Sequence, residues 1–470
     1  METDRNLTSK GLSQMRTYAL SLAGVSAIAA SAAAMPQTSP PPPVTDASSE
    51  VDQLKSIVKD LQGQVDALRA ENDEQWLTEA RANEIRGLVQ DVLADADTRA
   101  SLLQTGSMAG YDKGFFVSSA DGNYLLRIGG QLQVRYVYNL QDSDGATDDN
   151  RSGFEVRRAK LIMRGHVFDP SWTYDVQFAA DRATGNVQLE DAGWLQKDLG
   201  NGLKFRFGQM KAPFLREEIL SSTRMMAIER SLVNSFFTAG TVQGATATYE
   251  ADRWRISGMV HDGNNSRNTS WSTEDTEFAF SARGEWLAMG EAFKDLEMYD
   301  GFRGGATGLV IGGAMNYSKG EFGTGSNLPP PDFNNNEVEN LGLTADATWL
   351  ANGWSVAGAV MWRTLDPQTG DSLDQLGLLI RGGYFLTDDW ELYGQYEWAD
   401  SDIDGVEDLS VITVGVTKYW DKHNLKWQAD IGYGLNEVAS VFAQDGAGWR
   451  ADPTGDDGQI VFRTQIQLLF

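Results

Sequence analysis

The sequence predicts an all-β fold: a transmembrane antiparallel β-barrel of about 16 strands, preceded by an N-terminal α-helical coiled coil. Three observations predict it. Apolar and polar residues alternate with a period of two through most of residues 115–470. Short and long connections alternate between the predicted strands, as in outer-membrane barrels. Between residues 51 and 68, apolar residues instead recur every three or four positions, which is a helical period.

Composition narrows the possible classes of protein. The chain has 470 residues, a formal charge of −27, no cysteine and three histidines. The absence of cysteine excludes disulfides, thiolate metal sites and thiol catalysis, and three scattered histidines offer no metal site, so no cofactor is expected. The acidic charge opposes binding to nucleic acid. The mean hydropathy of −0.36 excludes helical membrane spans but not a β-barrel, whose alternating residues keep the average low.

Residues 1–34 have the layout of a secretory signal peptide. Three basic residues precede a stretch of apolar and small residues from Tyr18 to Ala30. Residues 30–34 then supply two A-x-A sequences of the type that signal peptidase cleaves. We expect cleavage there and export from the cytoplasm. An uncleaved helical anchor is the alternative, which the serine and alanine content disfavours.

Residues 35–50 form a proline-rich linker, in which Pro40 to Pro43 make a stiff spacer. Residues 51–105 are predicted to be a coiled coil and helical segment. In its first part, valine and leucine alternate at spacings of three and four, which favours a parallel coiled coil. A single amphipathic helix lying on a domain is the alternative. The residues that carry the pattern are Val51, Leu54, Val58, Leu61, Val65 and Leu68.

Residues 115–470 are predicted to form the barrel. Tryptophan stands at many strand ends, where interfacial aromatic girdles are expected, and the last strand ends in Phe470. A soluble β-sandwich is the alternative, but it does not predict this placement of aromatic residues. The sixteen predicted strands are 124–138, 154–167, 172–181, 187–196, 203–210, 241–250, 253–261, 276–286, 307–318, 341–350, 354–363, 375–386, 390–399, 409–420, 425–435 and 459–470.

Two connections between these strands stand out. The segment 211–240 follows the fifth strand and is the third of the long, outward loops. The segment 287–306 is also long, although it falls on the side of the short turns. Aspartate and glutamate cluster in the predicted loops 139–153, 400–408 and 436–458, where they would repel anions at low salt. Solvated loops are the simpler interpretation of these clusters, and binding of divalent cations is the alternative.

Five sequence runs between residues 152 and 240 carry a family resemblance. They are SGFEVRRAKL from residue 152, GLKFRFGQMKAPF from residue 202, EE at 217–218, SSTR at 221–224 and ERSL at 229–232. This part of the chain resembles the phosphate-selective porin O and P family. The resemblance implies a sixteen-stranded homotrimeric porin of the bacterial outer membrane, whose third loop folds into the lumen and narrows the pore.

Ten basic residues are the candidates for an anion pathway. By motif, the resemblance places Arg157 and Arg158 near the constriction and the basic residues of the third loop within it. Strand alternation points the others into the lumen, where arginine can bind phosphate or carboxylate oxygens through its planar fork. Charged wall residues that merely hydrate the lumen and pair with each other are the alternative. The ten candidates are Arg157, Arg158, Lys160, Arg164, Lys204, Arg206, Lys211, Arg216, Arg224 and Arg230.

These features predict a porin for passive diffusion of small hydrophilic solutes, with a preference for anions such as phosphate. The alternatives are a general or sugar-conducting porin with weak or cation selectivity, and a structural barrel that tethers the envelope. In the last case, the coiled coil and the proline spacer would reach the cell wall. An enzyme is not expected, because the chain contains no G-x-S-x-G, H-E-x-x-H or P-loop motif. The expected partners are outer-membrane lipid, further copies of the chain and small anions or solutes.

Overall fold

The computed structural model describes residues 47–71, 87, 89–90, 107–112, 114–141, 149–182, 184–272, 276–321 and 337–470. It divides into two units, residues 1–106 and 107–470. In the first unit, helix α2 (Ala47–Glu71) confirms the predicted helix and begins within the predicted linker. The signal peptide, the rest of the linker and most of 72–105 lie outside the described residues. Among the described residues, no helix has both the length and the apolar character needed to cross a membrane.

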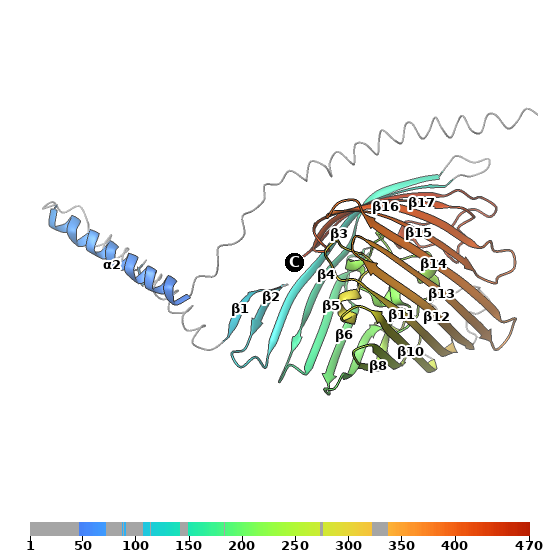
Figure 1. The fold of residues 1–470 in the computed structure, drawn as a ribbon, viewed down its shortest axis with the longest axis horizontal. Helices are drawn as coiled ribbons and strands as arrows, with labels where there is room; N and C mark the ends of the chain where they lie inside the picture. Colours follow the sequence, from blue (N-terminus) through green and yellow to red (C-terminus); the bar gives the residue numbers. More distant parts are fainter. Residues whose placement is uncertain are drawn as a thin grey trace, which may run out of the picture. The chain divides into compact units, whose positions relative to one another are not determined.

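The second unit is a closed barrel (Figure 1). Strands β3 to β18 form its wall, and all sixteen predicted strands are confirmed, with ends shifted by a few residues. The strands are β3 (Leu125–Gln141), β4 (Asp149–His166), β5 (Trp172–Ala180), β6 (Val187–Asp198), β7 (Leu203–Lys211), β8 (Thr241–Glu250), β9 (Trp254–His261), β10 (Thr276–Met289), β11 (Gly308–Glu321), β12 (Glu337–Ala351), β13 (Trp354–Pro367), β14 (Leu373–Phe385), β15 (Trp390–Asp400), β16 (Leu409–Asp421), β17 (Leu425–Gly434) and β18 (Ile460–Leu469).

Each wall strand pairs antiparallel with the strands before and after it in the chain, and β18 closes the ring against β3. Closure leaves no free strand edge in the ring, which satisfies the backbone where no water is available. Two short strands precede the ring and were not predicted. They are β1 (Met108–Tyr111) and β2 (Phe115–Ser118), and β2 pairs with the first residues of β3.

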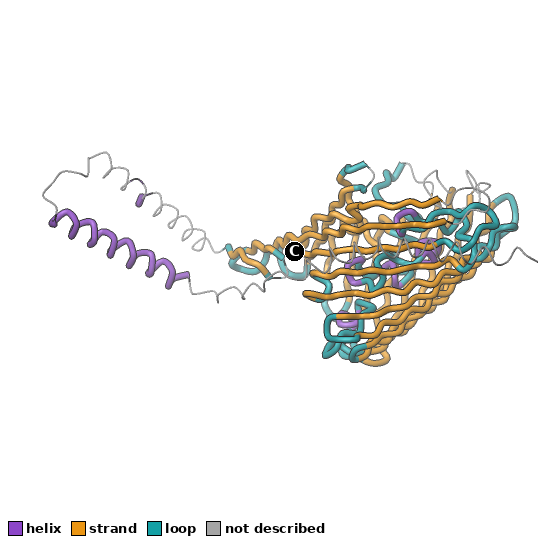
Figure 2. The backbone as a smooth tube through the Cα atoms, turned by 90° about the horizontal axis from the view of Figure 1, so that it is seen from above, coloured by secondary structure: helices purple, strands orange, loops and turns teal. Residues whose placement is uncertain are grey.

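The two ends of the barrel differ in their connections (Figure 2). We call the end with the short connections the turn end and the opposite end the loop end. At the turn end the chain reverses, for example, between residues 250 and 254 and between 385 and 390. The carboxyl terminus lies there too, because Gly130 N donates a 2.8 Å hydrogen bond to Phe470 O.

The barrel interior is filled on one side only. In β12 to β15, inward side chains are buried and alternate with more exposed outward ones. In β5 to β8, most inward side chains keep partial exposure, so this wall faces open space. Hydrophobic residues fill the other side, where α5 (Leu232–Phe237) and the loop 435–459 pack against inward residues of β13 to β16 and of β18. The remaining helical turns are α4 (Arg216–Ile219), η1 (Ser222–Arg224), η2 (Phe293–Leu296) and η4 (Asp445–Ala447).

Candidate functional site: a charged passage in the barrel

The connection between β7 and β8, residues 212–240, is the third loop, and it lies inside the barrel as predicted. Local capping shapes it. The Ser231 hydroxyl accepts a 2.9 Å hydrogen bond from Asn234 N and so begins helix α5. The α5 residues Phe236 and Phe237 then pack into the hydrophobic core beside β13 to β16. Burial of these rings holds the loop against one side of the barrel and leaves a passage along the other.

Basic residues that point inward from strands between β10 and β18 bind the two loops inside the barrel, the third loop and the loop 435–459, to the wall. They donate to backbone carbonyls or a carboxylate of the third loop and of the loop 435–459, and none of them is more than 4% exposed. Because these cations are buried and bonded to the loops, they cannot contact a solute in the passage. They are Arg283 to Phe214 O at 2.9 Å, Arg363 to Phe236 O at 2.8 Å, Arg381 to Glu217, Lys426 to Met225 O at 2.8 Å and Arg463 to Ala447 O at 2.8 Å.

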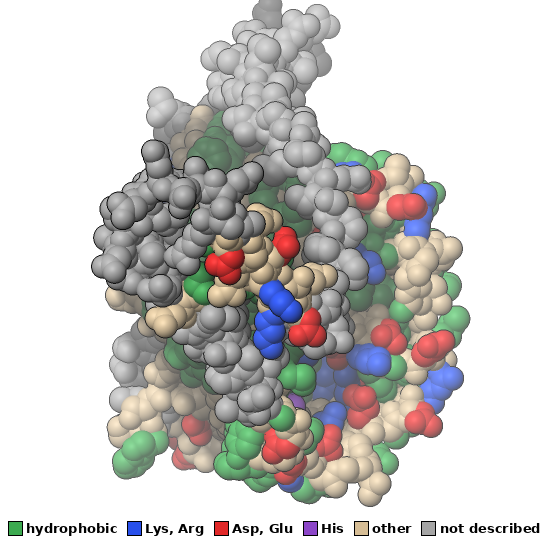
Figure 3. Space-filling view, turned by 90° about the vertical axis from the view of Figure 1, so that its left-hand side faces the viewer, with side chains coloured by type: hydrophobic (Ala, Val, Ile, Leu, Met, Phe, Trp, Pro, Cys, Tyr) green, Lys and Arg blue, Asp and Glu red, His purple; other side chains and the backbone are tan. Residues whose placement is uncertain are grey.

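A cavity of about 1170 Å³ occupies the turn end of the passage. Residues of β4 to β10, the third loop and the segment 290–307 line it. Eleven lysine or arginine residues and seven aspartate or glutamate residues contribute to this lining, although the whole chain carries an excess of acid. On the face of the barrel that is visible in Figure 3, basic and acidic side chains lie next to one another. The lining is therefore mixed in charge, with a basic excess.

Three of the ten candidates lie on the open wall of this cavity. Arg164 is half exposed and lies 3.3 Å from Asp175. The Arg206 guanidinium stacks on Trp194, 4.0 Å from the ring centroid, and donates a 2.8 Å hydrogen bond to Gln196 Oε1. The Lys204 side chain has no hydrogen bond or ion pair with any other described residue. These side chains are the wall cations best able to meet an anion.

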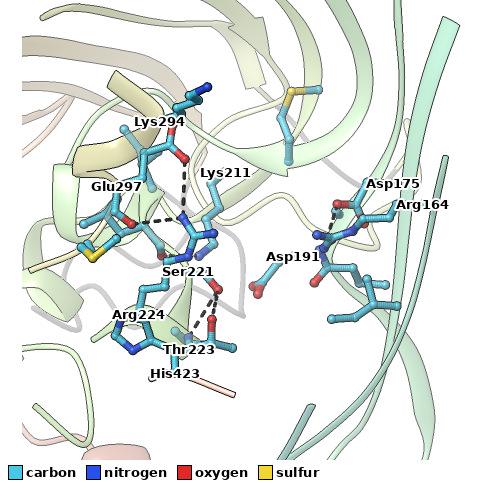
Figure 4. Close-up of a pocket in the computed structure, with 18 of the residues that line it drawn as sticks. Arg164, Asp175, Asp191, Lys211, Ser221, Thr223, Arg224, Lys294, Glu297 and His423 are labelled. Atoms are coloured by element: carbon cyan, nitrogen blue, oxygen red, sulfur yellow. Dashed lines mark hydrogen bonds and ion pairs between the residues drawn. The ribbon is translucent and has the colours of Figure 1, made fainter. Parts of the chain in front are cut away.

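Three further candidates line the cavity, two of them from the third loop and Lys211 from the end of β7. Arg224, in η1, lies 3.8 Å from the Glu297 carboxylate and is partly exposed. Lys211 lies 3.7 Å from Glu218, and Arg216 is 5% exposed and bonded to Glu285 at 3.0 Å. Figure 4 shows the two sides facing each other, with Arg164 and Asp175 on one and Arg224 and Glu297 on the other.

The other four candidates lie in ion pairs rather than along this cavity. Arg157 and Arg158 converge on the carboxylate of Glu229, at 2.7 Å and 2.8 Å. Lys160 is bonded to Asp191 at 2.5 Å. Arg230 donates to three backbone carbonyls of the third loop and lies 3.2 Å from Glu218. The contacts of these four side chains are those of structural ion pairs, and their part in an anion pathway stays a prediction.

Sequence reasoning missed other residues of the passage. Lys294, in η2, and Lys422, in the turn after β16, line the cavity without an ion pair among the described residues. The unusual length of the segment 287–306, which contains Lys294, was the sequence feature that could have indicated this part of the lining. His423 also lines the cavity. Burial lowers the pKa of His423 to about 3, although the Asp300 carboxylate 3.5 Å away opposes this shift, so the imidazole is neutral at pH 7.

Comparisons with known proteins agree on the fold. The family model described as "Phosphate-selective porin O and P" matches residues 127–430. Comparison with the curated proteins finds no match. The anion-selective porin from Comamonas acidovorans is similar over 73% of this chain and 99% of its own, with 10% identity and a TM-score of 0.53.

OmpT, an outer membrane protein of Vibrio cholerae, is similar in two solved forms. The in-vitro folded form covers 77% of this chain and 99% of its own, with 16% identity and a TM-score of 0.51. The trimer form covers 73% of this chain and 99% of its own, with 17% identity and a TM-score of 0.50. At these identities the solved structures support the barrel fold alone.

Proposed function

This chain belongs to the phosphate-selective porin O and P family, and we propose that its pore passes small hydrophilic solutes with a preference for anions such as phosphate. It is a porin, a non-enzymatic channel of the bacterial outer membrane. By the rule for such barrels, the turn end faces the periplasm and the loop end faces the outside. The observation that carries the anion preference is the basic excess of the cavity lining within a strongly acidic chain.

The wall cations supply a mechanism. Lys204 and Arg206 bring positive charge to the passage without a carboxylate in contact with either, and Arg206 presents a planar fork that suits phosphate oxygens. Seven carboxylates in the same cavity reduce the field, so we expect a moderate preference rather than exclusion of cations. A general porin with weak selectivity is the competing function that this mixed lining favours.

Removing one wall cation is expected to reduce anion selectivity. A unit charge about 8 Å from a permeating ion contributes about 0.5 kcal/mol in water, and the sign is opposite for an anion and a cation. Lys204→Gln should therefore lower the anion-to-cation permeability ratio about fivefold. The measurement is the reversal potential of the purified protein in a planar bilayer under a KCl gradient. Lys59 is an exposed residue of α2, so Lys59→Gln removes the same charge outside the barrel wall. It is the matched control and should leave the ratio unchanged. Cation selectivity of the native protein that persists at high salt would overturn the anion preference.

We also infer a homotrimer with a coiled-coil extension. Leu54, Leu61 and Val65 of α2 are exposed in the single chain, which suits a helix that pairs with copies of itself. The solved OmpT trimer is an example of a trimeric porin of similar fold. With the predicted signal peptide removed, the linker and helix would extend into the periplasm. Deleting residues 36–110 should weaken attachment of the envelope if this extension is a tether, and should leave conductance intact.

A further inference from the structure

The connection between β10 and β11, residues 290–307, is folded into the turn end of the barrel, and we call it the inserted turn. Its helical turn η2 buries Phe293 and Leu296, which are 3% and 1% exposed and pack against Leu287, Val310 and Leu350. A solvated loop would not bury such side chains. The inserted turn therefore fills part of the barrel interior. It enters from the turn end, whereas the third loop enters from the loop end.

Hydrogen bonds fix the inserted turn to the wall. Asp300 Oδ1 accepts a 2.6 Å bond from the Tyr419 hydroxyl, and Gly304 N donates a 2.7 Å bond to Asn352 Oδ1. Gly301 lies so close to Trp354 O that a Cβ atom would stand 2.1 Å from it, which only glycine permits. The position of the inserted turn in the opening is thus determined by several independent contacts.

One carboxylate of the inserted turn contacts two arginines of the passage. Glu297 Oε1 lies 3.2 Å from Arg255 Nη1, and Glu297 Oε2 lies 3.8 Å from Arg224 Nη1. The Arg224 guanidinium also donates a 3.4 Å hydrogen bond to Glu297 O. Arg255 has a second, closer carboxylate in Glu285 at 2.6 Å. Among the described residues, Arg224 has no carboxylate partner other than Glu297.

We propose that the inserted turn is the exit constriction of the pore and that Glu297 determines its charge selectivity by compensating Arg224. The third loop presents Arg224 to the cavity, and the inserted turn opposes it with a partly exposed carboxylate. An anion leaving through this end therefore meets a neutralised arginine rather than a free one. This inference rests on the proposed function, because it concerns the anion preference of the same pore.

The test of Glu297 is a comparison of two substitutions that remove the same charge. Glu297→Gln should raise the anion-to-cation permeability ratio about fivefold, because it frees one arginine within reach of the permeating ion and the added positive field acts oppositely on anions and cations. Glu291→Gln is the matched control, since Glu291 lies on the same segment, is exposed and has no ion pair among the described residues. In an Arg224→Gln background, Glu297→Gln should raise the ratio by a smaller factor, because only the field of the carboxylate itself and its contact with Arg255 remain to be removed.

The reversal potential of the full chain in a planar bilayer reports both outcomes. Equal shifts in Glu297→Gln and Glu291→Gln, or a shift of undiminished size in the Arg224→Gln background, would overturn the role of Glu297. The sign of the native reversal potential tests the proposed function separately. A cation-selective native pore with a Glu297-specific shift would refute the anion preference and leave this inference standing.

The constriction itself is tested by labelling, because the native chain contains no cysteine. Lys294→Cys places one thiol on the cavity side of the inserted turn, and Glu291→Cys places one on the same segment away from the cavity lining. A bulky, negatively charged methanethiosulfonate reagent should lower the single-channel conductance of Lys294→Cys much more than that of Glu291→Cys. With complete labelling verified by mass, unchanged or equally lowered conductance in the two variants would refute an exit constriction here.

Discussion

Replacing Glu229 with glutamine is expected to loosen the third loop and to lower the free energy of unfolding by about 3–5 kcal/mol. The Glu229 carboxylate is 5% exposed and lies 2.9 Å from Arg135, 2.7 Å from Arg157 and 2.8 Å from Arg158. A neutral amide would leave three adjacent, largely buried guanidinium groups without their shared counter-charge. Glu155 would compensate Arg135 only.

Two measurements check this expectation. Urea unfolding of the purified protein should show a lower midpoint for Glu229→Gln than for the native chain, and single-channel records should show larger current fluctuations as the loop moves. Glu291→Gln is again the control, because it makes the same chemical change at an exposed position without an ion pair among the described residues. Equal midpoints for Glu229→Gln and the control would mean that the three-arginine cluster does not hold the loop.

A comparable loss of stability is expected for Asp430→Asn. Arg463 forms two 2.8 Å bonds with the Asp430 carboxylate, both side chains are buried, and Arg463 also donates to Ala447 O. Removing the carboxylate leaves a buried arginine without an ion pair, which typically costs about 3–5 kcal/mol. The loop 435–459 would lose one of its attachments to the wall at the same time.

The double variant Asp430→Leu with Arg463→Met separates the ion pair from its surroundings. Because replacing both partners of a buried pair with apolar residues is often neutral, this variant should recover most of the stability that Asp430→Asn loses. Unfolding midpoints of the native chain and the two variants in one detergent make the comparison. A double variant less stable than Asp430→Asn would show that the side-chain shapes, or the bond from Tyr393 to Asp430, matter more than the charge.

The sequence by itself determined the sixteen strands, the barrel that they form and the inward direction of residues such as Lys160 and Lys204. A strand has a strict period of two, so each residue's face follows from local pattern alone. Counting strands identified the segment 211–240 as the third long loop, and the family resemblance implied that this loop lies inside the barrel. The coiled coil remains a prediction, because α2 is described as a single helix.

Only the tertiary structure decided which inward cations meet the passage. Lys204 and Arg381 have the same inward orientation, yet Lys204 lines an open cavity whereas Arg381 is buried against Glu217. The difference depends on where segments distant in the chain pack inside the ring, and strand periodicity carries no information about that packing. The inserted turn makes the same point, because its length was visible in the sequence, whereas the pairing of Glu297 with Arg224 required the two segments to be placed together.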